Sequence, residues 1–385
     1  MEPQLVNHFE NVQMLFMSIE LAVNDWKLAF SDGRNTNVET IDARHFGQLR
    51  EQIDTYKQRF QLDDEAQVVC CYEAGQDAFW VHRRLQEELE IENCVIDPAS
   101  IEDNQRSRSP KTDSIDAKTL VEKLIQFHQG NTGVFSVCHI PSRQDQEDRR
   151  INRELQRLKK EQKMHRSRIQ SLLRAKGVEL DTLHRLDERL DEMETGNGRP
   201  LGSNRKGEIR RELERLETVN DQMRTVIRRQ QQKVKNRSDE MKMIMINRLR
   251  ALKGIALDTA WRLVMEAFGW RAFQNRGQVA GCFGVDPTPH DTGESENEQG
   301  ISKAGSNRLR DLAVQVAWNW VKNQPGSELT KWFRKNFDTG NSNDRKRGIV
   351  AVARKLMSVL SKYVKGGEEP RGCIYNREEL LKQTA

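Results

Sequence analysis

Four acidic residues in the first third of the chain have the type and spacing of a metal-binding site. Glu20 lies within the apolar run MLFMSIEL, and Glu73 directly follows the run AQVVCCY. Asp113 and Asp116 are three residues apart, which places them on one face of a helix. Carboxylate oxygens are the ligands that Mg²⁺ prefers, and a pair of ions about 4 Å apart clamps the attacking and leaving oxygens of a phosphodiester. The set therefore predicts two magnesium ions and phosphodiester chemistry, with Glu20, Glu73, Asp113 and Asp116 as metal ligands and catalytic groups.

Each of these residues also has an ordinary structural interpretation. Asp113 has the residue type of a helix N-cap, and Glu73 that of a strand-end carboxylate facing water. Taken singly, the ordinary interpretation is favoured. Taken together, four converging carboxylates repel one another and need cations, so their joint placement favours the metal site.

The elements that must position these carboxylates form a mixed pattern. Strands are predicted twice within residues 14–31, with a turn near Asn24 and Asp25, and then at 37–41, 66–72 and 93–96; helices are predicted at 45–60, 77–89 and from 113 onwards. Three strands followed by alternating helices and strands predict a mixed α/β sheet of the ribonuclease-H kind. In such a sheet the first and fourth strands are neighbours, and the last helix packs over them. A lone doubly wound domain is the alternative.

The middle of the chain is predicted to be helical and highly charged. Residues 143–193 contain a heptad seam formed by Ile151, Leu155, Leu158, Gln162, His165, Ile169 and Leu172. A Gly/Pro-containing break at 195–206 precedes a second helix at 208–240, whose seam is Ile209, Leu213, Leu216, Asn220, Met223 and Ile227. The two helices predict either an antiparallel hairpin or a dimerising coiled coil, and the seams do not decide between them.

From about residue 245 the composition becomes globular again. The segment LKGIAL at 252–257 is similar to a helix-hairpin-helix turn, which aims backbone N–H groups at a phosphate, although Ala256 stands where Gly is usual. A polar loop is predicted at 285–305, followed by helices at 306–323, 327–336 and 348–365. The chain is thus predicted to be α/β plus α, with domains at 1–142, 143–244 and 245–385.

Composition and charge restrict the class of protein. The 385 residues contain no apolar run of about eighteen, so no membrane span is predicted. The acidic N-terminus lacks a secretory n-region, and the six cysteines show no C-x-x-C spacing, so a reducing cytoplasm is expected and no disulfide or zinc site. Residues 1–140 hold 13 Lys and Arg against 24 Asp and Glu, whereas 141–250 hold 29 against 19. An acidic head with basic segments favours a metal site joined to nucleic-acid-binding parts, and solvated helix faces are the alternative.

Three segments together give a resemblance to a known family. YEAG at 72–75, KTDSIDAKTL at 111–120 and GVDPTPHDTGESENEQGISKAGSNRLR at 284–310 resemble transposases of the insertion-sequence-110 family. The resemblance extends from about residue 14 to 365. It implies an N-terminal DEDD domain similar to Holliday-junction resolvases, a coiled coil, and a mostly helical C-terminal transposase domain that carries a nucleophilic serine.

The resemblance also implies the reaction and its partners. Such enzymes cleave and rejoin donor and target DNA, guided by a structured RNA, the bridge RNA. The serine forms a covalent bond to a DNA phosphate beside the carboxylate-bound magnesium ions. The proteins act as homodimers or dimers of dimers, with composite active sites.

Two positions depart from the family pattern. The first carboxylate is usually Asp but here is Glu20, which keeps the charge and adds one methylene. The serine usually precedes a glycine, and the matching dipeptide here is Thr292-Gly293, with Ser295 three residues further on. Threonine keeps a hydroxyl nucleophile but its β-methyl restricts χ1. Either Thr292 attacks, which we favour, or Ser295 attacks, or strand transfer is lost.

Basic residues near this loop are candidate contacts to nucleic-acid phosphates. They are Lys303, Arg308, Arg310, Arg345, Lys346 and Arg347. Basic residues on the first long helix are further candidates, with coiled-coil surface charge as an equal alternative: Arg149, Arg150, Arg153, Arg157, Lys159 and Lys160.

The sequence therefore predicts an RNA-guided, magnesium-dependent DNA transposase that works by transesterification. A junction-resolving nuclease that uses water is the first alternative. A nucleic-acid-binding transposase relative whose site has decayed is the second. No GxxxxGK[ST] loop is present, in agreement with a reaction that needs no ATP.

Overall fold

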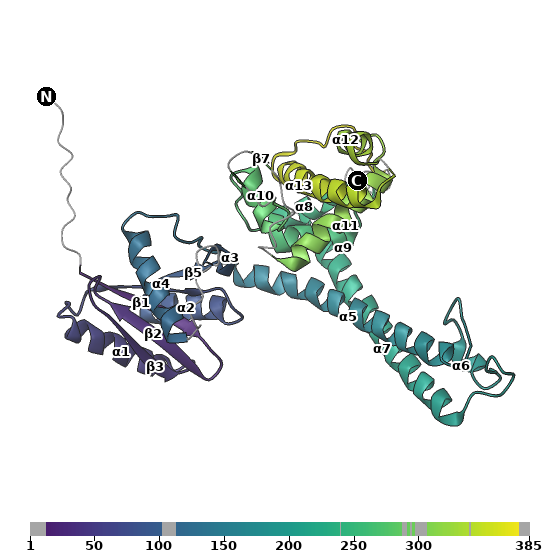
Figure 1. The fold of residues 1–385 in the computed structure, drawn as a ribbon, viewed down its shortest axis with the longest axis horizontal. Helices are drawn as coiled ribbons and strands as arrows, with labels where there is room; N and C mark the ends of the chain where they lie inside the picture. Colours follow the sequence, from purple (N-terminus) through teal and green to yellow (C-terminus); the bar gives the residue numbers. More distant parts are fainter. Residues whose placement is uncertain are drawn as a thin grey trace. The chain divides into compact units, whose positions relative to one another are not determined.

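The computed structural model describes residues 13–101, 113–238, 240–286, 291–292, 295–296, 306–338 and 340–376 (Figure 1). The chain divides into two compact units, Met1–Pro141 and Ser142–Ala385. Each unit has its own hydrophobic core.

The first unit is built on a five-stranded mixed sheet with the order β3-β2-β1-β4-β5. Its strands are β1 (Met14–Leu21), β2 (Asp25–Ser31), β3 (Thr36–Asp42), β4 (Gln67–Glu73) and β5 (Glu92–Ile96). The first three strands pair antiparallel, whereas β4 pairs parallel with both β1 and β5. The predicted strands are confirmed, as is the predicted neighbourhood of the first and fourth strands.

Both faces of the sheet are covered, which explains why β1 and β4 read as nearly continuous apolar runs. Alternate residues of β1 separate by face: Leu15, Met17 and Ile19 enter one core cluster, while Phe16 packs against another. The first cluster also contains buried residues of α1 (Phe46–Arg59) and α2 (Ala78–Leu89).

The other face of the sheet is covered by α4 (Asp113–His128), which contacts β1, β2 and β4. Its sheet-facing residues Leu120 and Leu124 pack against Val69 and Cys71 of β4. The short helix α3 (Pro98–Ile101) precedes it. The last helix of the unit therefore packs over the first and fourth strands, as predicted.

The second unit begins with two long helices, α5 (Arg143–Arg174) and α7 (Ser203–Asn236), which run side by side (Figure 1). Leu155 and Leu158 of α5 pack with Val219 and Val226 of α7, and further along Gln162 donates to Asn220 over 2.6 Å. The partners on α7 recede as those on α5 advance, from Asp148 and Lys233 through Gln162 and Asn220 to His165 and Glu212. The two helices therefore form an antiparallel hairpin within one chain.

The predicted helix at 143–193 is wrong beyond Arg174, where α5 ends. Gly177 has a φ of +71°, and a Cβ on it would lie 3.3 Å from the Cα of Gly196, so the chain turns tightly there. A further short helix, α6 (Leu186–Arg189), lies in the connection. The α7 core face also differs from the predicted seam, since Val219 and Val226 are buried one residue before Asn220 and Ile227.

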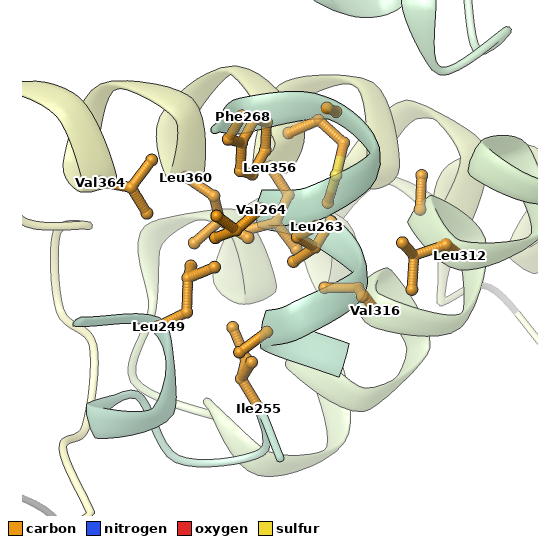
Figure 2. Close-up of a cluster of buried hydrophobic side chains, with 14 of the residues drawn as sticks. Leu249, Ile255, Leu263, Val264, Phe268, Leu312, Val316, Leu356, Leu360 and Val364 are labelled. Carbon is orange, nitrogen blue, oxygen red and sulfur yellow. The ribbon is translucent and has the colours of Figure 1, made fainter. Parts of the chain in front are cut away.

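The rest of the second unit is a compact helical body. Its elements are α8 (Met241–Ala251), α9 (Leu257–Leu263), the π-helix η2 (Val264–Phe268), α10 (Arg276–Cys282), β6 (Asp291–Thr292), β7 (Ser295–Glu296), α11 (Asn307–Asn323), α12 (Glu328–Phe337) and α13 (Ser342–Gly366). Figure 2 shows side chains from α8, α9, η2, α11 and α13 meeting in its core.

Two predictions for this body need correction. The helix predicted at 348–365 begins at Ser342, because the Asn341 side chain accepts the backbone N–H of Asn343 and caps it. The predicted loop at 285–305 contains the β6–β7 pair, whose short polar strands lack the apolar alternation that marks a strand. Within the described residues, no helix is long and apolar enough to span a membrane.

Candidate active site and basic surfaces

Two of the predicted carboxylates lie at matching positions on neighbouring strands. β1 and β4 pair in parallel, and Ser18 stands opposite Cys71. Glu20 and Glu73 each follow two residues later, so the strand period of two puts both on the face that carries Ser18 and Cys71. That face is the one that α4 covers.

Two side-chain hydrogen bonds fix the position of α4 on these strands. The buried Ser18 Oγ donates to the Ala117 carbonyl over 2.6 Å. The buried Cys71 Sγ lies 3.5 Å from the Leu120 carbonyl. The helix is therefore held against the same pair of residues, Ser18 and Cys71, that sets the register of the two strands.

The helix and strand geometries then bring the four acidic positions to one level. α4 runs opposite to β1, since His128 lies beside Phe16 with ring centroids 5.6 Å apart, while Ala117 lies beside Ser18. One helical turn back from Ala117 and Leu120, about 6 Å, are Asp113 and Asp116.

One pleat forward on the strands, about 7 Å, are the positions of Glu20 and Glu73. All four positions therefore lie at the same edge of the sheet, the one at which β1 and β4 end. Glu20, Glu73 and Asp116 are partly exposed, and the side chain of Asp113 lies outside the described residues.

The fit of this site to a metal rests on its donor chemistry. The four side chains offer carboxylate oxygens only, the donor type of Mg²⁺, with neither thiol nor imidazole among them. Within the described residues, however, no group of three His, Cys, Asp or Glu side chains lies close enough together to hold an ion in this structure.

The end of β4 is anchored by a buried polar network that sequence reasoning missed. The Tyr72 hydroxyl lies 3.1 Å from both the Ala78 carbonyl of α2 and Asn93 Oδ1 of β5. Asn93 Oδ1 also lies 2.6 Å from His82 Nδ1. Burial raises the pKa of Tyr72, so the phenol stays protonated and can donate to one of these two acceptors. In the YEAG motif, a structural anchor, Tyr72, thus directly precedes an acidic residue, Glu73.

The predicted nucleophile segment forms a two-stranded pair. β6 and β7 are antiparallel, with Thr292 opposite Ser295 and Asp291 opposite Glu296. The backbones of the two candidate nucleophiles are therefore directly opposed. Their side chains lie outside the described part of the structure, so the choice between them stays a prediction.

The predicted phosphate-binding residues fall into different environments. Arg308 on α11 is exposed, and so are Arg345, Lys346 and Arg347 in the first turns of α13, although Arg345 pairs with Asp338 at 3.4 Å. The Arg310 Nε donates to the Gly284 carbonyl over 2.8 Å, which ties α11 to the start of the loop. Lys303 lies outside the described residues.

A cavity of about 700 Å³ opens beside the start of this loop. Its walls come from α10, α12, α13 and the segment after α13, and they include Asp286, Arg276, Arg354 and Lys355. Lys362 and Arg371 on the rim are paired with Glu368 and Glu328. The cavity is thus lined by Arg276, Arg354 and Lys355, which form no ion pair within the part of the chain that the structure describes, and by the apolar residues Ala280, Leu329 and Val359.

The segment predicted as a helix-hairpin-helix-like turn connects α8 to α9, with Gly254 at a φ of +94°. A Cβ on Gly254 would lie 2.8 Å from the Cβ of Asn323, so glycine also allows α11 to approach. In the first turn of α9, however, Asp258 accepts from Lys159 over 2.8 Å. A carboxylate at that position disfavours a phosphate there, because like charges repel.

Comparison with known proteins defines the class. Residues 246–331 match the model of a family described as Transposase IS116/IS110/IS902 family. The chain is 36% identical over 377 residues to "Putative transposase y4rJ" of Sinorhizobium fredii (strain NBRC 101917 / NGR234), covering 94% of each protein. It is 38% identical over 72 residues to "Putative transposase y4qE" of the same strain, covering 19% of this chain and 18% of that protein. The protein is thus a transposase. It belongs to the IS116/IS110/IS902 family of insertion-sequence transposases, as its motifs predicted.

Proposed function

We propose that this transposase cleaves and rejoins DNA by magnesium-dependent transesterification, through a covalent bond between Thr292 and a DNA phosphate. The observation that carries the proposal is the common level of Glu20, Glu73, Asp113 and Asp116 at one edge of the sheet, set by the Ser18 and Cys71 contacts to α4. Family membership supports DNA as the substrate.

We infer that the first unit is a ribonuclease-H-like, resolvase-type domain. The strand order β3-β2-β1-β4-β5, with three antiparallel strands followed by two parallel ones, supports this inference. So does the position of α4 over β1 and β4. The α5–α7 hairpin is proposed as the coiled-coil part of the molecule, and the helical body as the domain that carries the nucleophile.

In this proposal the carboxylates hold two Mg²⁺ ions, which supply charge stabilisation and polarise the scissile phosphate. The Ser18 and Cys71 contacts keep α4 in register, so that Asp113 and Asp116 stay level with Glu20 and Glu73. The longer Glu20 side chain reaches the shared site from β1 with one more rotatable bond than an aspartate.

Thr292 acts as the nucleophile. Its Oγ1 forms a bond to phosphorus as its proton is lost, and the bond from phosphorus to the leaving DNA oxygen breaks. The leaving oxygen takes up a proton and becomes a strand-end hydroxyl. Rejoining reverses these steps on the recombined strand, so the bond energy is kept in the protein–DNA link and no nucleotide cofactor is consumed.

The remaining partners are a structured guide RNA and further copies of the chain. Basic residues of α5, α11 and α13 are proposed to hold nucleic-acid backbones. Composite sites within a homodimer or dimer of dimers would bring the acidic edge of one chain to the nucleophile segment of another.

A cleavage assay tests the metal site. Purified full chain, RNA transcribed from the DNA flanking its gene and labelled donor DNA are incubated across a magnesium series. Asp116→Asn is compared with Glu122→Gln, which removes an exposed carboxylate from the same helix. We expect Asp116→Asn to lower the cleavage rate by about 100-fold or more, and Glu122→Gln to leave it unchanged. Equal rates for the two variants would refute the site, and an absence of wild-type cleavage with binding retained would support a decayed transposase.

A further inference from the structure

Three arginines and a tryptophan form a cluster in the second unit, where α5 meets η2. The members of this Arg149 cluster are Arg149 and Arg153 of α5, and Trp270 and Arg271, which follow η2. The guanidinium carbons of Arg149 and Arg271 lie over the Trp270 ring, 4.8 Å and 4.4 Å from its centroid. Stacking of this kind orients both cations against the same indole ring.

The π-helix explains how Trp270 reaches this position. Gly269 ends η2, and its N–H donates to the Val264 carbonyl over 2.8 Å. A Cβ on Gly269 would lie 2.9 Å from that carbonyl oxygen, so only glycine fits this close approach. The next residue, Trp270, donates its ring N–H to the Met265 carbonyl over 2.9 Å, which fixes the indole. The cluster is therefore held rigidly by the backbone around it.

The cluster carries more positive than negative charge. Glu266 is fully engaged by Arg153, which binds both carboxylate oxygens over 3.0 Å each. The nearby Asp145 carboxylate is paired with Lys242. Within the described residues, neither acid forms an ion pair with Arg149 or Arg271.

Arg149 shows the consequence of this imbalance. The residue is only 7% exposed, yet its single hydrogen bond within the described residues is from Nε to the Asp145 carbonyl, at 3.3 Å. Its terminal nitrogens donate to no protein acceptor in that part of the chain. Beside it, the Arg271 Nε is fully buried and has no acceptor there either. Burial lowers the pKa of Arg149 to about 10; Glu266 opposes this effect, and Arg153 and Arg271 add to it.

We propose that the Arg149 cluster binds a backbone phosphate of nucleic acid, which supplies the missing negative charge and acceptors. A phosphate offers several oxygens to guanidinium N–H groups, which match its geometry well. Trp270 already stacks with two cations, and a nucleic-acid base could stack on its ring only by displacing them. The cluster therefore holds the nucleic-acid strand by its backbone and does not read its sequence. This inference rests on the proposed function, since DNA and a guide RNA are the phosphate-bearing partners of that proposal.

Salt-dependent binding measured on the full chain tests the inference. Fluorescence anisotropy gives the affinity for labelled duplex DNA, and in a second arm for an RNA transcript, between about 50 and 300 mM salt. Arg149→Met and Arg271→Met each remove one charge of the cluster. Arg210→Met is the charge-matched control, because Arg210 is already paired with Asp187 and Asp191.

We expect Arg149→Met and Arg271→Met to weaken binding several-fold and to make the slope of log K against log salt shallower by about 0.9 for duplex DNA, or about 0.7 for single-stranded RNA. The nucleic acid, DNA or RNA, whose salt dependence becomes shallower in these variants is the one that binds at the cluster. Arg210→Met should leave both slopes unchanged. Arg149→Met should melt no lower than the wild type, because it removes a buried cation that lacks a counter-charge.

Unchanged affinity and slope in both Met variants would overturn the inference and make the cluster a structural joint, while wild-type cleavage would leave the proposed function intact. If Arg149→Met fails to fold, the partly exposed Arg271 decides the outcome through its own variant. Wild-type protein that binds neither nucleic acid would overturn the proposed function and this inference together.

Discussion

Replacing Glu212 by glutamine should strongly destabilise the α5–α7 hairpin, although Glu212 has no part in the proposed chemistry. Glu212 is 2% exposed and accepts from three donors: His165 at 2.6 Å, Arg168 at 3.0 Å and Arg215 at 2.6 Å. The glutamine amide keeps the volume but removes the charge, and turns an NH₂ group towards donors that need an acceptor.

The magnitude follows from the exposure of the partners. The His165 side chain is 9% exposed, so its hydrogen bond to a charged acceptor is worth about 1.5–3 kcal/mol. The Arg168 and Arg215 side chains are 50% and 54% exposed, and solvent screening reduces each of those pairs to below about 1 kcal/mol. We expect a loss of about 2–3 kcal/mol in total, equivalent to a Tm lower by about 4–12 °C in a unit of this size.

The destabilisation should depend on pH in a defined direction. Burial raises the pKa of Glu212, but hydrogen bonds from His165 and Arg168 outweigh burial, so the net pKa lies below its ordinary value of 4.5. A carboxylate with a lowered pKa stabilises the fold fully above its unfolded pKa and loses that contribution as the pH falls through the folded pKa. The stability difference between wild type and Glu212→Gln should therefore be largest near neutral pH and shrink below about pH 4.5.

Differential scanning calorimetry and urea unfolding of the full chain measure this effect. Glu217→Gln is the matched control, because Glu217 lies on the same helix and is exposed. An equal Tm for the two variants at neutral pH, or a difference that grows on acidification, would refute the reasoning.

Three further predictions concern packing and positioning. Gly348→Ala should cost about 1–3 kcal/mol, because its Cβ would lie 2.5 Å from a side chain of α12, whereas Gly366→Ala on the same helix, with open space around its Cβ, should be nearly neutral in thermal melts. Leu360→Ala removes a fully buried side chain shown in Figure 2 and should cost about 2–5 kcal/mol in urea unfolding, with m unchanged. Ser18→Ala should cost only about 1 kcal/mol in stability but should raise the magnesium concentration needed for half-maximal cleavage. Ser18→Thr should restore the wild-type magnesium dependence. A lower maximum rate at unchanged magnesium dependence would contradict a positioning role for Ser18.

The first unit was predictable because its signals are local. β1 and β4 are largely apolar runs, and alternation along β1 assigns Glu20 to a face without any knowledge of the fold. The neighbourhood of β1 and β4 followed from the order of elements. The two hydrogen bonds that hold α4 did not, because Ser18 and Cys71 resemble any small buried residues in sequence.

The hairpin was predictable as two helices, but its polar interior was not fully so. His165 stood out at a seam position, whereas its partner Glu212 lies one position before the predicted seam residue Leu213 and looked like surface charge. The end of α5 was missed since its cause, the close approach of Gly177 to Gly196, joins residues in two different loops. Periodicity alone carries no such information.

The Arg149 cluster could not be recognised in the sequence for a similar reason. Arg149 belongs to a basic run of α5, and nothing in that run separates it from Arg150, which is exposed. Only the fold shows that Arg149 is buried against Trp270, a residue far along the chain.

A covalent-trapping experiment tests whether the reaction passes through a bond between Thr292 and a DNA phosphate. Full chain, guide RNA, magnesium and labelled donor DNA are run on a denaturing gel, with Thr292→Ala, Ser295→Ala and Asp116→Ala beside the wild type. We expect a protein–DNA adduct in the wild type and in Ser295→Ala, and none in Thr292→Ala or Asp116→Ala. Cleavage of DNA without any adduct in the wild type would contradict it, because water would then be the nucleophile and the protein a junction-resolving nuclease.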